Sequence, residues 1–200
     1  YQEPLLLSGS PRCDILLNEQ VVQHAKVRWV YSLPVDSKIL IYAPTFRGGS
    51  QSKHRDVFES EISLDFDRLV QSLERRFGGE WYIFLRLHPQ LAAKMDTMLS
   101  RTGNQRLIDI SQKDDLYEYL AGTDAFITDY SSAGPDAAMM DIPVFVYADD
   151  LDKYMADRGS LLRDLREFPF PVARTNDELE KNILDFTEER YLDRLHTFFK

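Results

Sequence analysis

The chain has 200 residues, of which 44% are hydrophobic and 12% are aromatic. This content can bury one substantial core, so a disordered or fibrous chain is excluded and one globular domain over residues 1–200 is expected. The 24 Lys and Arg residues against 33 Asp and Glu residues give a net charge of −9, which disfavours general binding to nucleic acid. A local basic pocket stays compatible with one anionic ligand, because salt screens distant carboxylates.

Cysteine and histidine usage argues against disulfides and zinc. Cys13 is the single cysteine, and the four histidines lack zinc-ligand spacing, so a reducing setting without a metal is expected. No apolar run reaches the roughly 20 residues that a membrane span needs. The sequence opens at Tyr1 without an initiator methionine, so we expect a fragment of a longer protein.

Short β-rich runs alternate with helical patterns along the chain, which predicts a parallel sheet. The expected strands lie at 38–42, 81–87, 107–110, 125–128 and 144–147. The expected helices lie at 64–77, at 91–99, after a cap at 114–115, and at 133–140, and Asn176 is expected to cap the terminal helices. An acidic loop at 148–152 should lead into a long irregular stretch that reaches 170–173. The predicted divisions are a connecting segment 1–35, a sheet core 36–175 and C-terminal helices 176–200.

Polar side chains follow the predicted strands at their carboxyl ends. In a Rossmann-like α/β fold with a doubly wound parallel sheet, these ends form one edge, and ligands bind in the crevice beside it. The sequence therefore predicts that residues far apart in the chain converge there: Thr45, Arg47, His88, Asp129, Ser131, Ser132 and Arg158.

Ser131 and Ser132 lie where a predicted strand turns into a helix. Backbone N–H groups, hydroxyls and the helix dipole at such a turn favour a phosphate. The alternative is that either serine serves only as a helix N-cap. No G-x-S-x-G turn is present, which argues against a serine hydrolase although His88 and Asp129 are available.

Further side chains are suited to contacts with phosphates. His88 ends an apolar strand, where an imidazole could donate to a phosphate oxygen or accept a proton from an attacking hydroxyl; a purely structural role is the alternative. Arg47 and Arg158 offer planar donor pairs matched to phosphate oxygens, with surface salt bridges as the alternative. Gly159 lets the backbone beside Arg158 approach a ligand.

The acidic loop could hold a divalent ion through Asp149, Asp150 and Asp152, but a loop exposed to solvent is the favoured interpretation. The chain has no phosphate-binding glycine loop of the P-loop type and no G-x-G-x-x-G. ATP hydrolysis and dinucleotide binding therefore have no motif support. We expect neither a metal nor a cofactor.

Five ordered stretches resemble the CDP-glycerol glycerophosphotransferase family, whose members polymerise or prime teichoic acids in bacterial walls. They are SGSPRCD at 8–14, IYAPTFR at 41–47, LRLHP at 85–89, ITDYSS at 127–132 and VYADDLDKY at 146–154, with Arg158 and Gly159 beyond. One departure is Ala133-Gly134-Pro135 after the serines, where many relatives have bulkier apolar residues.

The resemblance implies the C-terminal, donor-binding half of a two-domain GT-B architecture. The implied reaction is attack of an acceptor hydroxyl on the β-phosphorus of CDP-glycerol or a related CDP-polyol, which displaces CMP and transfers a polyol-phosphate unit. His88 matches the family's C-terminal histidine, and Ser131 and Ser132 match its serine pair. Arg158 and Gly159 match its Arg-Gly pair, whereas the family's N-terminal histidine motif is absent from this sequence.

Two alternatives stay open: a sugar-nucleotide glycosyltransferase or epimerase of the same fold, and a non-catalytic nucleotide-binding domain. The resemblance further implies a lipid-linked polymer acceptor, bound through the missing N-terminal domain at the cytoplasmic face of the membrane. Membrane contact is not expected through this acidic domain. The chain should fold alone and be inactive as a transferase.

Overall fold

The computed structural model describes residues 9–45, 62–87, 104–158 and 164–200. In these ranges the strands form one parallel sheet with the order β3-β2-β1-β4-β5-β6. The strands are β1 (Lys38–Tyr42), β2 (Trp81–Leu85), β3 (Leu107–Asp109), β4 (Ala125–Thr128), β5 (Val144–Tyr147) and β6 (Val172–Ala173). This order is that of a doubly wound, Rossmann-like sheet, so the predicted fold class is confirmed.

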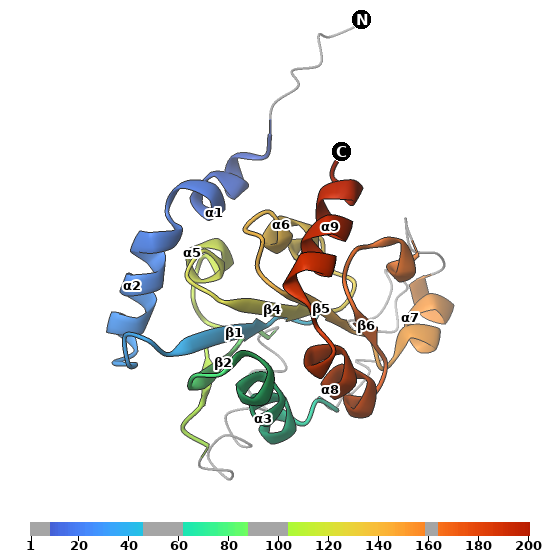
Figure 1. Cartoon of the computed structure of the whole chain (residues 1–200), viewed down its shortest axis with the longest axis horizontal. Helices are drawn as coiled ribbons and strands as arrows, with labels where there is room; N and C mark the ends of the chain where they lie inside the picture. The colour runs from blue at the N-terminus through green and yellow to red at the C-terminus, as the bar shows by residue number, and fades with distance from the viewer. Residues whose placement is uncertain (1–8, 46–61, 88–103, 159–163) are drawn as a thin grey trace, which may run out of the picture.

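Helices cover both faces of the sheet. Figure 1 shows α5 and α6 on one side, and α3 and α8 on the other. The helices are α1 (Asp14–Asn18), α2 (Gln20–Val30), α3 (Phe66–Phe77), α5 (Leu116–Leu120), α6 (Ala133–Ala138), α7 (Leu151–Arg158), α8 (Asn176–Leu184) and α9 (Glu188–Phe198), with 3₁₀ turns η1 (Pro11–Cys13) and η2 (Leu165–Glu167). Because both faces are covered, the strands are continuous apolar runs rather than alternating ones.

The core is centred on β1, which pairs with β2 and β4. Ile39, Leu40 and Ile41 are all 0% exposed. One continuous apolar cluster runs from Leu16 in α1 to Leu195 in α9. The two ends of the described chain therefore pack into the same core as the sheet.

The boundaries of α3 follow from local chemistry. The Asp65 side chain accepts a hydrogen bond from the N–H of Arg68 at 3.0 Å and caps the first turn. Gly78 ends the helix with φ 67°, a conformation that costs glycine little, and its N–H donates to the carbonyl of Glu74. Leu69 and Leu73 on the inner face are buried against the sheet.

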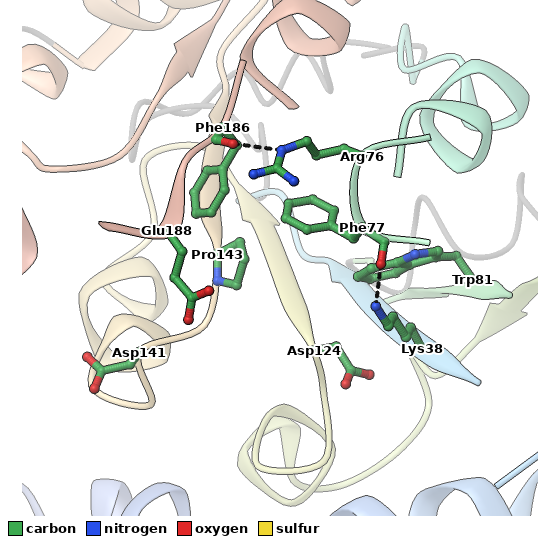
Figure 2. Close-up of a pocket in the computed structure, with 9 residues that line it drawn as sticks. All are labelled: Lys38, Arg76, Phe77, Trp81, Asp124, Asp141, Pro143, Phe186 and Glu188. Atoms are coloured by element: carbon green, nitrogen blue, oxygen red, sulfur yellow. Dashed lines mark hydrogen bonds between the residues drawn. The ribbon is translucent and has the colours of Figure 1, made fainter. Parts of the chain in front are cut away.

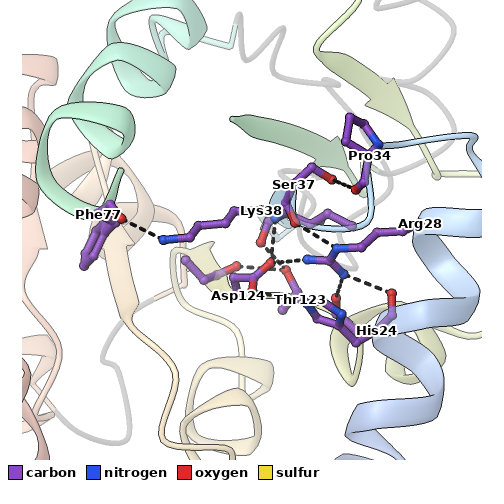
Figure 3. A network of polar contacts seen from close by, with 11 residues as sticks. His24, Arg28, Pro34, Ser37, Lys38, Phe77, Thr123 and Asp124 are labelled. Carbon is purple, nitrogen blue, oxygen red and sulfur yellow. Dashed lines mark hydrogen bonds and ion pairs between the residues drawn. The ribbon is translucent and has the colours of Figure 1, made fainter. Parts of the chain in front are cut away.

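A buried arginine joins α2 to the amino ends of the central strands (Figure 3). Arg28 is 2% exposed, and its guanidinium donates to the carbonyls of Ser37 at 2.8 Å and Gly122 at 3.0 Å. It also pairs with Asp124 at 2.5 Å, and that carboxylate accepts the N–H of Ile39 at 2.7 Å. Burial lowers the pKa of Arg28 and the carboxylate of Asp124 opposes this change.

The five expected strands are found, although β2 ends at Leu85 rather than 87 and β3 at Asp109 rather than 110. The short strand β6 was not predicted. The helix expected at 64–77 begins at Phe66, and the one expected at 133–140 ends at Ala138. The helix expected at 91–99 lies outside the described residues.

Two expectations were wrong, and two helices were not predicted. Thr175, not Asn176, is the N-cap of α8, because its side chain accepts the N–H of Glu178. Residues 151–158 form helix α7 where an irregular stretch was expected. The sequence did not predict α1 and α2 within the segment 1–35.

Candidate functional site

The topological switch point lies between β1 and β4, where the strand order reverses. Just beyond the two strands, the N–H of Thr45 donates to both carboxylate oxygens of Asp129 at 2.9 Å each. The hydroxyl of Thr128 donates to the carbonyl of Ala43 at 2.7 Å. Asp129 is 3% exposed, so its carboxylate interacts with neighbouring groups, among them the N–H groups of Thr45 and Tyr130, rather than with solvent. This buried carboxylate fixes the two strand ends beside each other.

The two serines at the start of α6 make different contacts. The Ser131 hydroxyl accepts the N–H of Ala133 at 3.1 Å, so it stabilises the turn. Ser132 occupies the N-cap position, but its side chain makes no capping hydrogen bond. The alternative that a serine serves only to cap the helix start thus fits Ser131, whose hydroxyl accepts a backbone N–H, better than Ser132. At the carboxyl edge of the sheet, Ser131 is half-buried and Ser132 is exposed.

Gly134 lies where the start of α6 packs against the end of β4. A Cβ atom there would lie 3.4 Å from the methyl group of Thr128 and 3.5 Å from the ring of Phe170. These contacts are at the tight end of ordinary packing. A Cβ atom would thus make ordinary van der Waals contacts here, so the packing of the helix start on β4 does not require glycine.

An ion pair that the sequence did not predict, between Arg12 and Asp136, joins the N-terminal segment to α6. Arg12 donates to Asp136 in the first turn of α6, with Nη2 at 2.8 Å and Nε at 3.0 Å from the same oxygen. The Tyr117 hydroxyl donates to that oxygen at 2.5 Å. Burial, followed by the hydrogen bond to Asp136, raises the pKa of Tyr117, which keeps this hydroxyl protonated. The stretch at 8–14 therefore lies beside the serine turn. The one sign in the sequence that Arg12 belongs to the site was its place in that matched stretch.

A tyrosine pair connects the serine turn to α7. The rings of Tyr130 and Tyr154 stack with centroids 3.8 Å apart and planes 20° apart. The Tyr130 hydroxyl donates to Asp150 at 3.0 Å. The sequence gave neither tyrosine a role, although both lie in matched motifs. The pair orients α7, whose last residue is Arg158.

The aspartates of the acidic loop have separate partners. Asp149 accepts a hydrogen bond from Ser63, and Asp152 pairs with Arg174. Asp150 accepts a hydrogen bond from Tyr130, so each of the three carboxylates contacts a different side chain. In the described ranges no group of three or more His, Cys, Asp or Glu side chains is placed to hold a metal ion.

The structure brings together four of the predicted site residues at the carboxyl edge: Thr45, Asp129, Ser131 and Ser132. Arg158 lies at the end of α7. Arg47, His88 and Gly159 lie outside the described residues, so their predicted convergence remains a prediction.

The fold and this edge define a Rossmann-like α/β domain with a helix start at its switch point. The chain belongs to the CDP-Glycerol:Poly(glycerophosphate) glycerophosphotransferase family, whose model matches residues 1–200. The family expected from the sequence motifs is thereby confirmed.

Among curated proteins, the teichoic acid poly(glycerol phosphate) polymerase of Staphylococcus epidermidis is 32% identical over 99% of this chain and 27% of its own length. The teichoic acid poly(ribitol-phosphate) polymerase of Bacillus spizizenii is 33% identical over 94% of this chain and 29% of its own length. The chain thus spans less than a third of these two relatives.

Solved structures of the wall teichoic acid polymerase TagF share the fold. One aligns with a TM-score of 0.74 at 29% identity, covering 97% of this chain and 46% of that one. A TagF variant soaked with CDPG aligns with a TM-score of 0.72 at 28% identity, covering 96% of this chain and 43% of that one. The structure of a UDP-N-acetylglucosamine 2-epimerase homologue from Listeria monocytogenes has a TM-score of 0.51 at 17% identity, and this likeness concerns the fold alone.

Proposed function

We propose that this chain is the donor-binding domain of an enzyme that transfers a glycerol-phosphate or related polyol-phosphate unit. The donor is CDP-glycerol or a related CDP-polyol, and the acceptor is a polymer of the teichoic-acid or capsule type. Family membership over residues 1–200 supports the class of reaction. The observation that carries the assignment to this edge is the Asp129 contact with Thr45, which places the serine turn at the switch point.

In the proposed reaction an acceptor hydroxyl attacks the β-phosphorus of the donor, the bond to CMP breaks, and CMP leaves with the electron pair. Ser132 and the N–H groups at the start of α6 would donate to the phosphate, and Arg47 and Arg158 would neutralise its charge. His88 would stabilise the same phosphate or take the acceptor proton. Such positioned charges supply most of the catalysis in phosphoryl transfer.

Asp129 is assigned a positioning role. Its carboxylate is buried and bound to the N–H groups of Thr45 and Tyr130, so it orders the two loops that would flank the donor. The backbone of Thr45 and Gly159 would then line the phosphate path.

The test is CMP release by the full-length enzyme with CDP-glycerol and with CDP-ribitol. His88→Ala should lower kcat by about 10²-fold or more, because general acid–base or charge stabilisation by one side chain has that size. His196→Ala is the matched control, since His196 lies exposed on α9 and its side chain is 3.6 Å from Asp141. Wild-type turnover by the His88 variant would remove it from the mechanism.

The same purified enzyme discriminates the alternatives. A sugar-nucleotide transferase or epimerase would bind UDP-sugars in preference to CDP-polyols. The family assignment does not favour that alternative. A non-catalytic domain would leave the enzyme's turnover unchanged when Ser132 and Arg158 are both replaced by alanine.

The acceptor and the cellular site follow from the same proposal. A lipid-linked acceptor would be bound by the part of the protein outside this chain, at the inner face of the cell membrane. In the described ranges, no helix has the length and apolarity of a membrane span. With a net charge of −9, the isolated chain should not float with anionic liposomes at physiological salt, and strong flotation would contradict this proposal.

A further inference from the structure

Two features of the described chain lie outside the contacts assigned to the donor. The first is a pocket of about 280 Å³ at the amino ends of the strands (Figure 2). Cations and carboxylates line it together, so its charges favour no class of ligand: Lys38, Arg76, Asp141 and Glu188. The second is the Asp136 cluster, which Arg12, Tyr117 and Asp136 form beside the serine turn. Its charges are matched, and it bears directly on the donor site.

The Asp136 cluster joins three segments of the chain at one oxygen atom. Arg12 from η1 and Tyr117 from α5 both donate to Oδ2 of Asp136 in α6. Nη2 of Arg12 lies at 2.8 Å, Nε at 3.0 Å and the Tyr117 hydroxyl at 2.5 Å from that atom. The guanidinium also lies 5.8 Å from the centre of the Tyr117 ring. Three donors on one oxygen leave the carboxylate little freedom, because any movement lengthens at least one of these strong, charge-assisted bonds.

Helix α6 depends on such an anchor because it is short. It has six residues, and a helix of this length is not stable without tertiary contacts. Ser132 is its N-cap, but the serine side chain makes no capping hydrogen bond. Asp136 follows Ser132 by four residues, so the two lie about one turn apart on the same side of the helix. A shift of the Asp136 carboxylate would therefore move the serine turn with it.

We propose that Arg12 and Tyr117 are positioning residues of the donor site: they hold Asp136, and through it they fix the serine turn that would face the donor phosphate. The proposal rests on the donor-binding role already proposed for this turn. Arg12 contributes more than Tyr117, because it also compensates the charge of the carboxylate. Burial raises the pKa of Tyr117, so its hydroxyl stays neutral. Without Arg12, an unpaired carboxylate would stand about one turn from the bound phosphate and would repel it.

The test uses the full-length enzyme and two measurements. One is CMP release at varied CDP-glycerol, which separates KM from kcat. The other is calorimetric binding of CDP, which carries both phosphates of the donor and requires no turnover. Arg12→Gln should raise the KM for CDP-glycerol and weaken CDP, each by about tenfold, the size expected when a charged hydrogen-bond partner is lost. The kcat should change by less than about threefold, because the donor and the transition state lose the same contact.

A double-mutant cycle shows whether Arg12 acts through Asp136. Asp136→Asn should raise the KM as Arg12→Gln does, and the two changes together should cost no more than the larger single one. Arg12→Lys keeps the charge and should recover part of the loss. Arg75→Gln is the matched control, since Arg75 is exposed on α3 and lies 3.4 Å from Glu180. It removes the same charge on the other side of the sheet (Figure 1) and should leave the KM unchanged.

The remaining variants guard against misfolding and separate the two proposals. Thermal melting shows which variants are folded, and Tyr117→Phe, which keeps the charges of the cluster, should raise the KM less than Arg12→Gln does. A folded Arg12→Gln variant with wild-type KM and CDP affinity, additive effects in the cycle, or an equal loss in Arg75→Gln would each overturn the proposal. Ser132→Ala leaves the cluster intact. Normal kinetics of this variant beside a raised KM of Arg12→Gln would contradict the role proposed for Ser132 and still support the cluster.

Discussion

At the scale of single residues, Gly122 joins α2 to the turn after α5. A Cβ atom there would lie 2.8 Å from the carbonyl oxygen of Gln23 and 3.1 Å from a methyl group of Val27. The first contact is with backbone, which cannot rotate away. Gly122→Ala should therefore lower the free energy of unfolding by about 1–3 kcal/mol, the usual cost of overpacking. Urea denaturation measures this change.

Gly9→Ala is the matched control for that substitution. A Cβ atom at Gly9 would meet nothing within 4 Å, so the stability of this variant should stay within about 0.5 kcal/mol of wild type. Equal destabilisation of both variants would show that the contact with α2 is not the cause.

His24 makes the stability depend on pH. Burial, and then the charge of Arg28, lower the pKa of His24 below its ordinary value of 6.5, although Asp124 opposes this change. The unfolded chain therefore binds this proton more tightly than the folded protein, and stability falls as the pH drops through the unfolded value. His24→Asn should lose less stability than wild type between about pH 7.5 and 5.5. Chemical denaturation at the two pH values measures the difference, and an unchanged slope would contradict the assignment.

The residues of the switch-point edge were predictable because strand ends in a parallel sheet share one edge. That rule located Thr45, Asp129, Ser131 and Ser132 without any contact information. It could not identify Arg28 or Arg12, because their roles arise from partners 96 and 124 residues away. An arginine in an acidic chain is otherwise expected at the surface.

At the scale of elements, the cap of α3 offers a direct test. Asp65→Ala removes the side chain that accepts the N–H of Arg68 and should cost about 1 kcal/mol of stability. Thr187→Ala, at the N-cap of α9, is the control, since Thr187 makes no side-chain capping hydrogen bond. Thermal denaturation of the two variants compares them. A Thr187 variant as unstable as the Asp65 variant would mean that the capping bond is not responsible.

Strands were easier to predict than the N-terminal helices. Each central strand is a short apolar run between polar turns. The run is apolar throughout because helices cover both faces of the sheet. The pattern of α2 is obscured because Val21, Val22 and Trp29 point outward and are 85%, 64% and 81% exposed. Helix α7 was missed because the stacking of Tyr154 on Tyr130, rather than an apolar stripe, orients it.

At the scale of the whole molecule, one core includes both ends of the described chain. We expect the 200 residues to unfold in a single cooperative transition and to bind a cytidine nucleotide weakly. They should release no CMP from CDP-glycerol, because a donor bound along one open edge of a sheet lacks a second wall to orient the acceptor. Lost positioning of this kind can account for about 7–11 kcal/mol of barrier reduction.

Circular dichroism during heating, calorimetry with CMP and a CMP-release assay together test this expectation. Turnover by the chain alone would show that the rest of the protein is dispensable for transfer. Two separate melting transitions would show that the predicted divisions 1–35, 36–175 and 176–200 do not form one unit.

The contact between Thr45 and Asp129 also bears on how the chain is made. The two residues are 84 positions apart, so a ribosome must finish β4 before β1 gains its second neighbour and before the switch point exists. Until then one side of β1, a central strand of the finished sheet, has unpaired backbone groups, which makes the nascent chain prone to wrong strand pairing. Pairings this distant in sequence also form slowly. A nucleotide that binds at the switch point can therefore stabilise the chain only once β4 has been made, and it cannot guide the earlier pairing of β1 with β2.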